Sequence, residues 1–583
     1  MSLPPDFEKF KGEIFSHKQD RNDYYYKSYQ YAKSSFRSIK DMNPKYVLYP
    51  KATDDDDFDD IYLALNYAKK NKLKIAIRTG GHQYTGASST DRNNLQLDLA
   101  DTYKKFEWND DKTILEIGIS YSLDEFARKL KEAGRFLPSG QCEYVGLGGH
   151  VQTGGYGQLA RGFGLLTDYV TEIRIISYDE TEQDYKAKWI KKGDELFRAV
   201  IGGSPGNFGI ITHVKFMVLK DSDYPNSRGF FAVCKYDPKN FKTFLDIKLE
   251  TVGEDDFDYC VSVLSDSGIE DEENALDKDP SYDETYNQQR YTNKGNKNVI
   301  WPTIIIIHAY HYRNYDEQTS PIKKIKDVTT EWNIVTDTNE HVEVSQLVRN
   351  WIMLIRREFQ LQYIKRGYVS NWEAGKLIDT EWSAWVTNRI NIAICKKLKV
   401  SAQFKYFGGE ESEFYKKGEE NKDTTSLSWR KMNFGITIDI FFEKDNFHLA
   451  SEWQRENDKC ISVINPIFSD EDIHKYKELC ELRNKYDPDK IFIPNDFCVG
   501  VKYEAPIKVL KDILDKNSEK FEHMLKHEDF DSLEEQIFKL VAENDTLRRE
   551  NTEVKAENSL PEEFGDDRVE DEWVDEDDDV SLC

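Results

Sequence analysis

The chain has 583 residues, of which 39% are hydrophobic and 13% aromatic, and its net charge is −27. This length predicts several domains, and the apolar content is enough for sizeable cores, which excludes a wholly disordered chain. The negative charge argues against nucleic acids and anionic membrane surfaces as partners, because both repel an acidic protein.

The N-terminal region is polar. Residues 1–20 contain no apolar run of secretory length, and the longest apolar stretch, at 304–307, is far too short to span a bilayer. The eight cysteines are widely scattered and do not form the pattern of a disulfide framework. We therefore expect a cytoplasmic protein without a membrane anchor, whose residues 1–44 form a helical extension.

Residues 45–225 show short strands that alternate with helices. Six aspartates between residues 54 and 60 precede an apolar-periodic segment, and they predict a helix N-terminus, where carboxylates interact favourably with the helix dipole. A buried strand is predicted at 73–77. Ser122 and Glu125 form a capping-box pattern that predicts the start of another helix.

Glycines gather in three clusters within this segment. The first lies in residues 78–82, directly after the predicted strand, the second spans 140–157, and the third spans 202–212. Glycines allow backbone N–H groups to approach a pyrophosphate closely. Tight turns alone would explain one cluster but not three, so we predict backbone lying flat against a long ligand. A Rossmann fingerprint is rejected for residues 155–160, because no clear strand precedes them.

The second half of the chain, from about 226 to 455, has longer strands with polar connections. Residues alternate in character over 304–312, which predicts a strand with two unlike faces, and 434–442 predicts another. Residues 265–298 are acidic and polar, which is typical of an exposed insertion. Strands with helices between them predict an antiparallel sheet that carries helices on one side.

The C-terminal region differs from the rest of the chain. A heptad seam in residues 506–560 predicts a two-stranded coiled coil, through which the chain would form a homodimer; a single solvated helix is the alternative. Residues 561–583 carry twelve carboxylates and one arginine, which predicts a disordered acidic tail. The seam consists of Leu533, Ile537, Leu540, Asn544, Leu547, Asn551, Val554 and Asn558.

The glycine-rich motifs resemble those of the berberine-bridge-enzyme-like FAD-linked oxidases, a branch of the vanillyl-alcohol-oxidase superfamily that contains hexose and oligosaccharide oxidases. Residues 78–84, Arg-Thr-Gly-Gly-His-Gln-Tyr, resemble the family's pyrophosphate loop, whose histidine bonds the flavin 8α-methyl group. Residues 142–150 resemble the stretch whose cysteine bonds flavin C6, with the same eight-residue step from cysteine to histidine. Residues 486–492 resemble the C-terminal signature whose strand returns to the flavin. Gly408-Gly409 and Arg430 stand where the family's substrate domain carries its Gly-Gly and Arg.

The resemblance implies an α+β fold with three main parts. These are a two-subdomain FAD-binding domain of the vanillyl-alcohol-oxidase type over 45–225, and a substrate domain over 226–455 whose antiparallel sheet is covered by helices. A C-terminal segment over 456–505 returns to the FAD-binding domain. The coiled coil and the acidic tail follow as additions to the family's plan.

The resemblance also implies FAD bound bicovalently through His82 and Cys142. Two tethers make the flavin a better electron acceptor, which suits the oxidation of unactivated alcohols, and they prevent its loss; the redox chemistry is the cofactor's. The residues expected to contact FAD are Arg78, Thr79, Gly80, Gly81, His82, Tyr84, Ser88, Cys142, Val145, Gly146, Gly148, Gly149, His150, Gly154, Gly155, Gly157, Gly209, Ile211 and Asn495.

Val145 bears on whether O2 can reach the flavin. It matches the position at which the family has either a small residue that lets O2 reach the flavin or a leucine that blocks it. Valine there implies an oxidase that produces hydrogen peroxide, although valine is also simply a good strand residue.

Oxidation of an alcohol needs a base for the hydroxyl proton. The family's Tyr-x-Asn-Tyr would fall at 463–466, which keeps Asn465 and neither tyrosine. Asp439 is the first candidate, because an unpaired carboxylate in an apolar strand is costly unless it is functional; an outward-facing aspartate is the alternative. Tyr310 and Tyr312 are further candidates. No metal site is predicted, because His308 and His311, the histidines of the strand at 304–312, point to opposite faces.

The sequence is compatible with three functions. The first is an oxidase that takes a primary or anomeric alcohol, such as a sugar, with O2 as the acceptor. The second is oxidative cyclisation or dehydrogenation of a specialised metabolite on the same scaffold. The third is a catalytically silent flavin-binding scaffold that dimerises through its tail and presents the acidic end to a basic partner. Retention of both tether residues and Val145 argues against the third.

Overall fold

The protein is described by a computed structural model that covers most of residues 4–500. The described residues are 4–17, 21–28, 30, 42–84, 86–250, 256–265, 303–312, 320–329, 333–339, 342–350, 362–371, 382–442, 446–462, 470–495 and 498–500. The heptad seam, the acidic tail, residues 463–466 and all but the first residue of the acidic insertion lie outside them.

The first sheet has four strands in the order β1-β2-β4-β3, in which β2, β4 and β3 are parallel and β1 is antiparallel. Asp60, in the first turn of α2, is buried and accepts hydrogen bonds from the backbone N–H groups of Lys11 at 2.7 Å and Gly12 at 2.9 Å, which fixes the start of β1. The helical extension predicted for residues 1–44 contains the helix α1, but it also contains the strand β1, which extends this sheet. The elements are β1 (Glu13–Phe15), α1 (Arg21–Ser28), β2 (Tyr46–Tyr49), α2 (Asp59–Asn71), β3 (Ile75–Arg78) and β4 (Leu95–Asp98).

The second sheet is antiparallel, with five strands in the order β5-β6-β10-β8-β9. The predicted capping box is confirmed: Ser122 accepts from the backbone N–H of Glu125, whose carboxylate accepts from Ser122 N–H, and α3 begins at the next residue. The elements are β5 (Phe106–Trp108), β6 (Ile114–Gly118), α3 (Leu123–Glu132), α4 (Leu147–Gln152), α5 (Ala160–Phe163), β8 (Val170–Asp179), β9 (Asp184–Lys191), α6 (Glu195–Val200) and β10 (Ile210–Met217); the short strands β7 (Arg135–Phe136) and β11 (Leu219–Lys220) pair separately.

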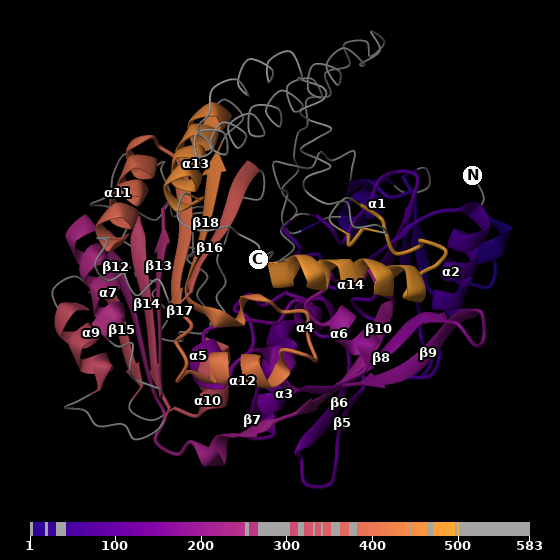
Figure 1. The fold of residues 1–583 in the computed structure, drawn as a ribbon, viewed down its shortest axis with the longest axis horizontal. Coiled ribbons are helices and arrows are strands. Elements are labelled where there is room, and N and C mark those ends of the chain that lie inside the picture. Colours follow the sequence, from indigo (N-terminus) through magenta and orange to yellow (C-terminus); the bar gives the residue numbers. More distant parts are fainter. Residues whose placement is uncertain are drawn as a thin grey trace. The chain divides into compact units, whose positions relative to one another are not determined.

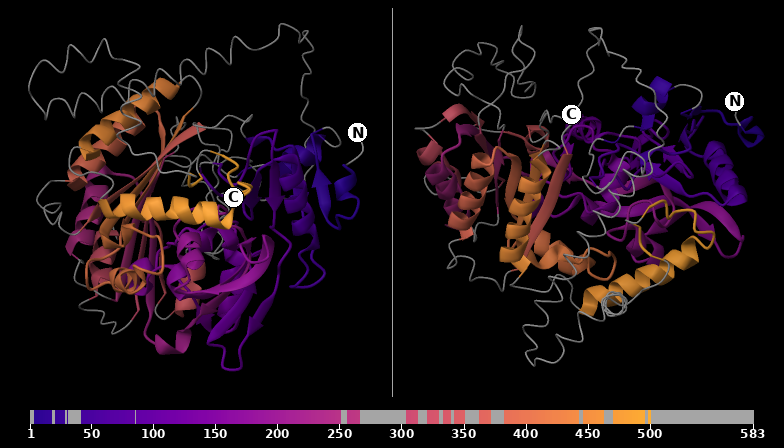
Figure 2. Two further views of the ribbon diagram at one scale, coloured as in Figure 1. Left: turned by 45° about the vertical axis from the view of Figure 1, so that its right-hand side comes forward. Right: turned by 90° about the horizontal axis from the view of Figure 1, so that it is seen from above.

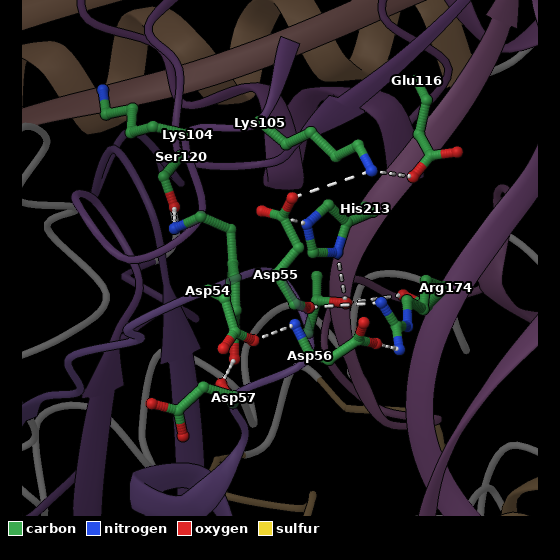
Figure 3. Close-up of polar contacts among 12 residues, drawn as sticks. Asp54, Asp55, Asp56, Asp57, Lys104, Lys105, Glu116, Ser120, Arg174 and His213 are labelled. Atoms are coloured by element: carbon green, nitrogen blue, oxygen red, sulfur yellow. Dashed lines mark hydrogen bonds and ion pairs between the residues drawn. The ribbon is translucent and has the colours of Figure 1, made fainter. Parts of the chain in front are cut away.

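The acidic turn before α2 joins these two sheets (Figure 3). Asp56 pairs with Arg174 of β8, and the carboxylate of Asp55 lies 3.4 Å from the buried ring of His213 on β10 and 3.7 Å from Lys105 Nζ. Burial lowers the pKa of His213, which Asp55 only partly offsets. The predicted helix start is thus confirmed, although Asp55 and Asp56 serve the contact between sheets rather than the first helical turn.

The third sheet has seven antiparallel strands in the order β15-β12-β14-β13-β17-β18-β16. Helices α7, α9, α11 and α13 pack on one face and bury a core of aliphatic and aromatic side chains against it (Figure 1). The predicted antiparallel sheet with a helical layer is confirmed, although α5 and α10 also pack against part of its other face. The elements are β12 (Arg228–Lys235), α7 (Pro238–Glu250), β13 (Phe257–Leu264), β14 (Ile304–His311), α9 (Pro321–Thr329), β15 (Asn333–Asn339), α10 (Val344–Asn350), β16 (Gln362–Asn371), α11 (Trp382–Cys395), β17 (Lys399–Tyr406), α12 (Glu413–Asn421), β18 (Met432–Phe442) and α13 (Phe447–Ser462).

The chain then leaves the third sheet and returns to the first two. Helix α14 (Asp470–Tyr486) packs on α6 and β8, away from the helices of the third sheet (Figure 2). After it, Asp487 accepts hydrogen bonds from the Tyr185 hydroxyl at 2.7 Å and from two backbone N–H groups, and it pairs with the buried Arg483. Ile491 O then accepts from Ile75 N of β3. The signature returns as predicted, as a turn rather than as a strand.

Arg430 joins the third sheet to the rest of the protein. Its guanidinium donates two parallel hydrogen bonds of 2.8 Å to Asp168, and both side chains are buried. Asp168 also accepts from the backbone N–H of Leu165 at 2.7 Å and from Asn421 Nδ2 at 3.0 Å. This carboxylate therefore holds segments from both halves of the chain, and a charge removed from the pair leaves its partner buried alone.

We expect Arg430→Met to lower the free energy of unfolding by about 3–5 kcal/mol, because an uncompensated buried carboxylate is strongly destabilising. Chemical denaturation of the full-length protein measures this. The control is Lys416→Met, whose pair with Glu411 is exposed and 3.7 Å long; it should cost less than about 1 kcal/mol. Equal losses in the two variants would contradict a special role for Arg430.

Candidate active site

A cavity of about 440 Å³ lies between the glycine-rich loops and the face of the third sheet opposite to α7, α9, α11 and α13. From the sheet side it is lined by residues of β13, β14, β16, β17 and β18. Sixteen of the predicted FAD contacts line it, namely Arg78, Thr79, Gly80, Gly81, His82, Tyr84, Ser88, Cys142, Val145, Gly146, Gly148, Gly149, His150, Gly157, Gly209 and Ile211.

Three predicted contacts lie outside the lining. Gly154 and Gly155 have φ angles of +100° and +68°, and side chains of other residues occupy the space beside them, so they shape the turn after α4. Asn495 donates through Nδ2 to the carbonyl oxygens of Ala87 at 2.8 Å and Ser89 at 3.2 Å, so it braces the end of the His82 loop from behind. For these three residues the prediction of a direct contact is not supported.

The loops that carry His82 and Cys142 meet at two glycines. A Cβ added to Gly80 would lie 2.3 Å from Gly146 N and 2.6 Å from Tyr144 O, both backbone atoms that cannot turn away. In the other direction, a Cβ on Gly146 would lie 2.5 Å from Gly80 N. This backbone contact brings the half-buried side chains of His82 and Cys142 to one cavity although they are 60 residues apart in the chain.

We expect Gly80→Ala to push these loops apart, which should lower flavin incorporation and destabilise the fold by about 1–3 kcal/mol, as overpacking typically does. The ratio of flavin to protein absorbance and thermal unfolding measure the two effects. Gly367→Ala is the control, because its added Cβ meets no described atom within 4 Å. Normal flavin content in Gly80→Ala would show that the loop contact is dispensable.

Polar side chains tie the glycine clusters together, and the sequence analysis missed them. Gln152 accepts from Gly206 N at 3.0 Å and donates to Gly148 O at 2.7 Å, so it links the second cluster to the third. Asn207 donates to Phe492 O at 2.7 Å and accepts from Val499 N at 2.9 Å, which attaches the third cluster to the C-terminal segment. Nothing in a sequence of glycines marks an amide as the connector.

Arg78 and His150 are held by the protein itself. Arg78 Nε lies 3.0 Å from the fully buried Asp98, and Nη1 donates to Lys27 O at 2.9 Å, so this guanidinium is fixed by groups of the protein. His150 Nε2 accepts a hydrogen bond from Gly140 N at 2.9 Å, and burial lowers the pKa of His150 to about 4. The ring is therefore neutral at physiological pH, with its proton on Nδ1.

Asp439 faces the cavity from β18. It is 2% exposed, and Lys365 Nζ of β16 lies 2.9 Å and 3.2 Å from its two carboxylate oxygens. The alternative of an outward-facing aspartate is therefore wrong. Lys365 was missed, because its partner is 74 residues away in the chain and only the pairing of β16 with β18 brings them together.

Tyr310 lies elsewhere, and its candidacy as a base is not supported. Strand alternation does place it on the same face of β14 as Ile306, which lines the cavity. It is four residues further along, however, which is about 13 Å at the rise of a strand. There it packs in a buried apolar cluster with Tyr312 and Leu347.

The described part of the chain was compared with the requirements of a metal site and of a membrane-spanning helix. No group of three or more histidine, cysteine, aspartate or glutamate side chains could hold a metal ion among the described residues. His308 and His311 lie at opposite faces of β14, as predicted. None of the described helices has the length and apolar character needed to cross a membrane.

Residues 44–184 match the family model described as FAD binding domain. The chain contains an FAD-binding domain. Over 178 residues it is 32% identical to berberine bridge enzyme-like 5 of Arabidopsis thaliana, a match that covers 29% of this chain and 31% of that protein. It is also 37% identical over 157 residues to an uncharacterized FAD-linked oxidoreductase, YgaK of Bacillus subtilis (strain 168), covering 27% of this chain and 34% of that one. The match thus spans about a third of these relatives' length.

Solved structures extend the likeness in fold to most of the chain. Berberine bridge enzyme-like 1 of Physcomitrella patens superposes with a TM-score of 0.62 at 15% identity, over 86% of this chain and 100% of that one. A chitooligosaccharide oxidase gives a TM-score of 0.60 at 16% identity, over 85% and 98%. The predicted resemblance to berberine-bridge-enzyme-like FAD-linked oxidases is confirmed.

The wall that the FAD-binding domain contributes to the cavity fits the cofactor chemically. Gly80, Gly81, Gly146 and Gly149 present backbone rather than side chains to it, which suits the close approach of a pyrophosphate. His82 and Cys142 offer two nucleophilic side chains on the same cavity. On the opposite wall, Asp439 supplies a carboxylate. The arrangement therefore provides for binding, for attachment and for proton transfer.

Proposed function

We propose that this protein is an FAD-dependent oxidase that converts a primary or anomeric alcohol, such as that of a sugar, to the carbonyl compound, with O2 as the acceptor and H2O2 as the product. The observation that carries the proposal is the meeting of His82, Cys142 and Asp439 on one cavity. Relatives in fold named chitooligosaccharide oxidase and xylooligosaccharide oxidase support a hydroxyl-bearing substrate.

The loop wall of the cavity would hold the cofactor, and the sheet wall would bind the substrate. His82 and Cys142 would hold FAD as a covalent group, and FAD bound there supplies the two-electron oxidation and the reaction with O2. Asp439 accepts the hydroxyl proton as general base. The side chains beside it on the sheet can hydrogen-bond further hydroxyl groups of the substrate; they are Ser262, Ser401, Gln403 and Thr437.

The second candidate is oxidative cyclisation or dehydrogenation of a specialised metabolite. It is favoured by one observation: the lining residues that the described strands of the third sheet contribute beside Asp439 include no tyrosine, and the tyrosines of the lining, Tyr84 and Tyr156, belong to the loops. Berberine bridge enzyme of Eschscholzia californica, with a TM-score of 0.58, shares the fold.

An anaerobic reduction experiment with the purified full-length protein tests the proposal. Under anaerobic conditions, a panel of sugars and primary alcohols is added and the flavin absorbance followed; air is then admitted and peroxide measured. Bleaching by an alcohol with stoichiometric peroxide afterwards supports the oxidase. Bleaching without peroxide would instead indicate a dehydrogenase. If no member of the panel bleaches the flavin, the alcohol oxidase is contradicted and the second candidate remains.

We expect Val145→Leu to slow the reaction with O2 about tenfold or more, a rise in barrier of ~1.4 kcal/mol. Val145 lines the cavity, and one added methylene there narrows the approach to the cofactor. Stopped-flow mixing of the reduced protein with oxygenated buffer measures the rate, while anaerobic bleaching should change little. If both rates fall equally, the residue affects substrate binding rather than oxygen access.

A further inference from the structure

Charges on the cavity wall are almost all matched within the protein. The described lining residues of ionisable acid, lysine, arginine or histidine type are Arg78, His82, His150, Lys365 and Asp439. Arg78 is paired with the buried Asp98, and His150 is neutral. On the wall formed by the third sheet, the charged residues are thus Lys365 and Asp439, which face each other.

The position of this pair follows from strand register. Ser401 of β17 is opposite Asp439 of β18, and Asp439 is opposite Lys365 of β16, so the three form one row across the sheet. The neighbouring row, two residues along each strand, runs through Ser262, Gln403 and Thr437. The wall therefore changes from neutral hydroxyl and amide groups in its middle to an ion pair at the β16 edge.

Lys365 is fixed from two sides. Besides Asp439, its ammonium lies 3.9 Å from the centre of the Tyr84 ring, in the loop that carries His82. Tyr84 is itself held by β16, because the Tyr363 hydroxyl donates to Tyr84 O at 2.8 Å. The Lys365 side chain is 29% exposed whereas that of Asp439 is 2% exposed. The ammonium is therefore oriented by an acid and an aromatic face rather than left to follow solvent.

We propose that Lys365 and Asp439 form a specificity-determining pair that sets this cavity for uncharged, hydroxyl-bearing substrates and disfavours carboxylated and amino-bearing analogues. The inference rests on the proposed function, in that it takes the wall of the third sheet as the substrate-binding wall. The pair is neutral as a whole, so it gives an uncharged ligand hydrogen-bonding groups without a net field.

A charged ligand meets an unfavourable wall for either sign of charge. A carboxylate that enters beside the pair loses water and gains no net attraction, because Asp439 opposes what Lys365 offers. An ammonium also loses water and gains no net attraction, because Lys365 opposes what Asp439 offers. Rejection of the wrong partner by unmatched charge is a common way to obtain specificity. Removing one member of the pair should therefore reverse the preference in a direction fixed by the charge that is left.

The test uses three probes that share one ring: D-glucose, D-glucuronate and D-glucosamine at pH 6.5, with a parallel set of benzyl alcohol, 4-(hydroxymethyl)benzoate and 4-(aminomethyl)benzyl alcohol. Binding to the holoprotein is measured by calorimetry and by perturbation of the flavin spectrum under anaerobic conditions. The wild type should bind the neutral probe best. Lys365→Met should shift the ratio toward the cationic probe at least about tenfold, and Asp439→Asn toward the anionic one.

Control variants guard against a merely structural effect. Lys365→Arg keeps the charge and should keep the wild-type ranking, and Lys365→Met/Asp439→Asn removes both charges and should restore the preference for the neutral probe. Lys242→Met, in an exposed pair on α7, should change nothing. Flavin content and thermal unfolding show whether each variant is folded.

An unchanged ranking in the two single variants, or no binding of any probe to any variant, would overturn the inference. The proposed function fails separately: if the charge preferences switch as expected but no alcohol bleaches the flavin, the pair selects ligands by charge in a protein that is not an alcohol oxidase. If alcohols bleach the flavin but the charge preferences do not switch in the single variants, the specificity role of the pair is contradicted and the proposed oxidase function stands.

Discussion

The double variant His82→Ala/Cys142→Ala is expected to lose all acid-stable flavin. Both side chains line the cavity from the FAD-binding domain, and the contact between Gly80 and Gly146 holds their loops together. If each forms a bond to FAD, precipitation with acid leaves yellow colour in the wild-type pellet and none in that of the double variant. Each single variant should keep its colour in the pellet through the remaining bond.

The single variants should also oxidise substrate more slowly. Loss of either bond makes the bound flavin a weaker acceptor, and we expect flavin bleaching to slow by about tenfold or more, a rise in barrier of ~1.4 kcal/mol. Anaerobic stopped-flow spectroscopy with the best substrate of the panel measures it, and the spectrum of each denatured single variant shows which bond remains.

Cys498 supplies a matched control for the cysteine. It lies in the C-terminal segment and lines the same cavity as Cys142. Cys498→Ser should keep a bicovalent flavin. If Cys498→Ser loses one bond while Cys142→Ala keeps both, the second tether has been assigned to the wrong cysteine. If the wild-type colour washes out with acid, neither bond exists.

Local chemistry explains why the flavin-side wall could be predicted. The glycine clusters, the capping box at Ser122 and the His82 loop are contiguous in the chain, so their geometry is set by residues only a few positions apart. Even there, direct contacts and supports look alike in sequence: Gly154 and Gly155 shape a turn beside the cavity, and Asn495 braces a loop.

The substrate-side wall depends on register across strands that are distant in sequence. Alternation along β14 places Tyr310 on the correct face, but the distance along the strand removes it from the cavity. The alternation of residues along β18 likewise assigns Asp439 to one face of the sheet, but it does not show whether that face is exposed to solvent or lines the cavity. The pairing of Asp439 with Lys365 follows only once β16 and β18 are neighbours, and nothing in the sequence between them specifies that order.

Asp439→Asn is expected to lower kcat/KM by about 10²–10⁴, the range that a positioned general base contributes. Asparagine keeps the size of the side chain and its place beside Lys365, but it accepts no proton from the substrate hydroxyl. Flavin content should stay normal, because Asp439 lies on the wall opposite the tethers. Anaerobic bleaching rates across substrate concentrations separate the chemical step from binding, and the loss should fall on the limiting rate.

The unpaired ammonium left by Asp439→Asn is a second source of lost activity, and it is separable. Lys365→Met/Asp439→Asn removes that charge as well, so activity that returns in the double variant would assign the defect to Lys365 and not to a missing base. If the double variant is as slow as Asp439→Asn, the missing proton acceptor explains the loss. A full rate in Asp439→Asn itself would move the base to another group. Because the described sheet wall offers no second carboxylate, the tyrosines of the lining, Tyr84 and Tyr156, would be the next candidates.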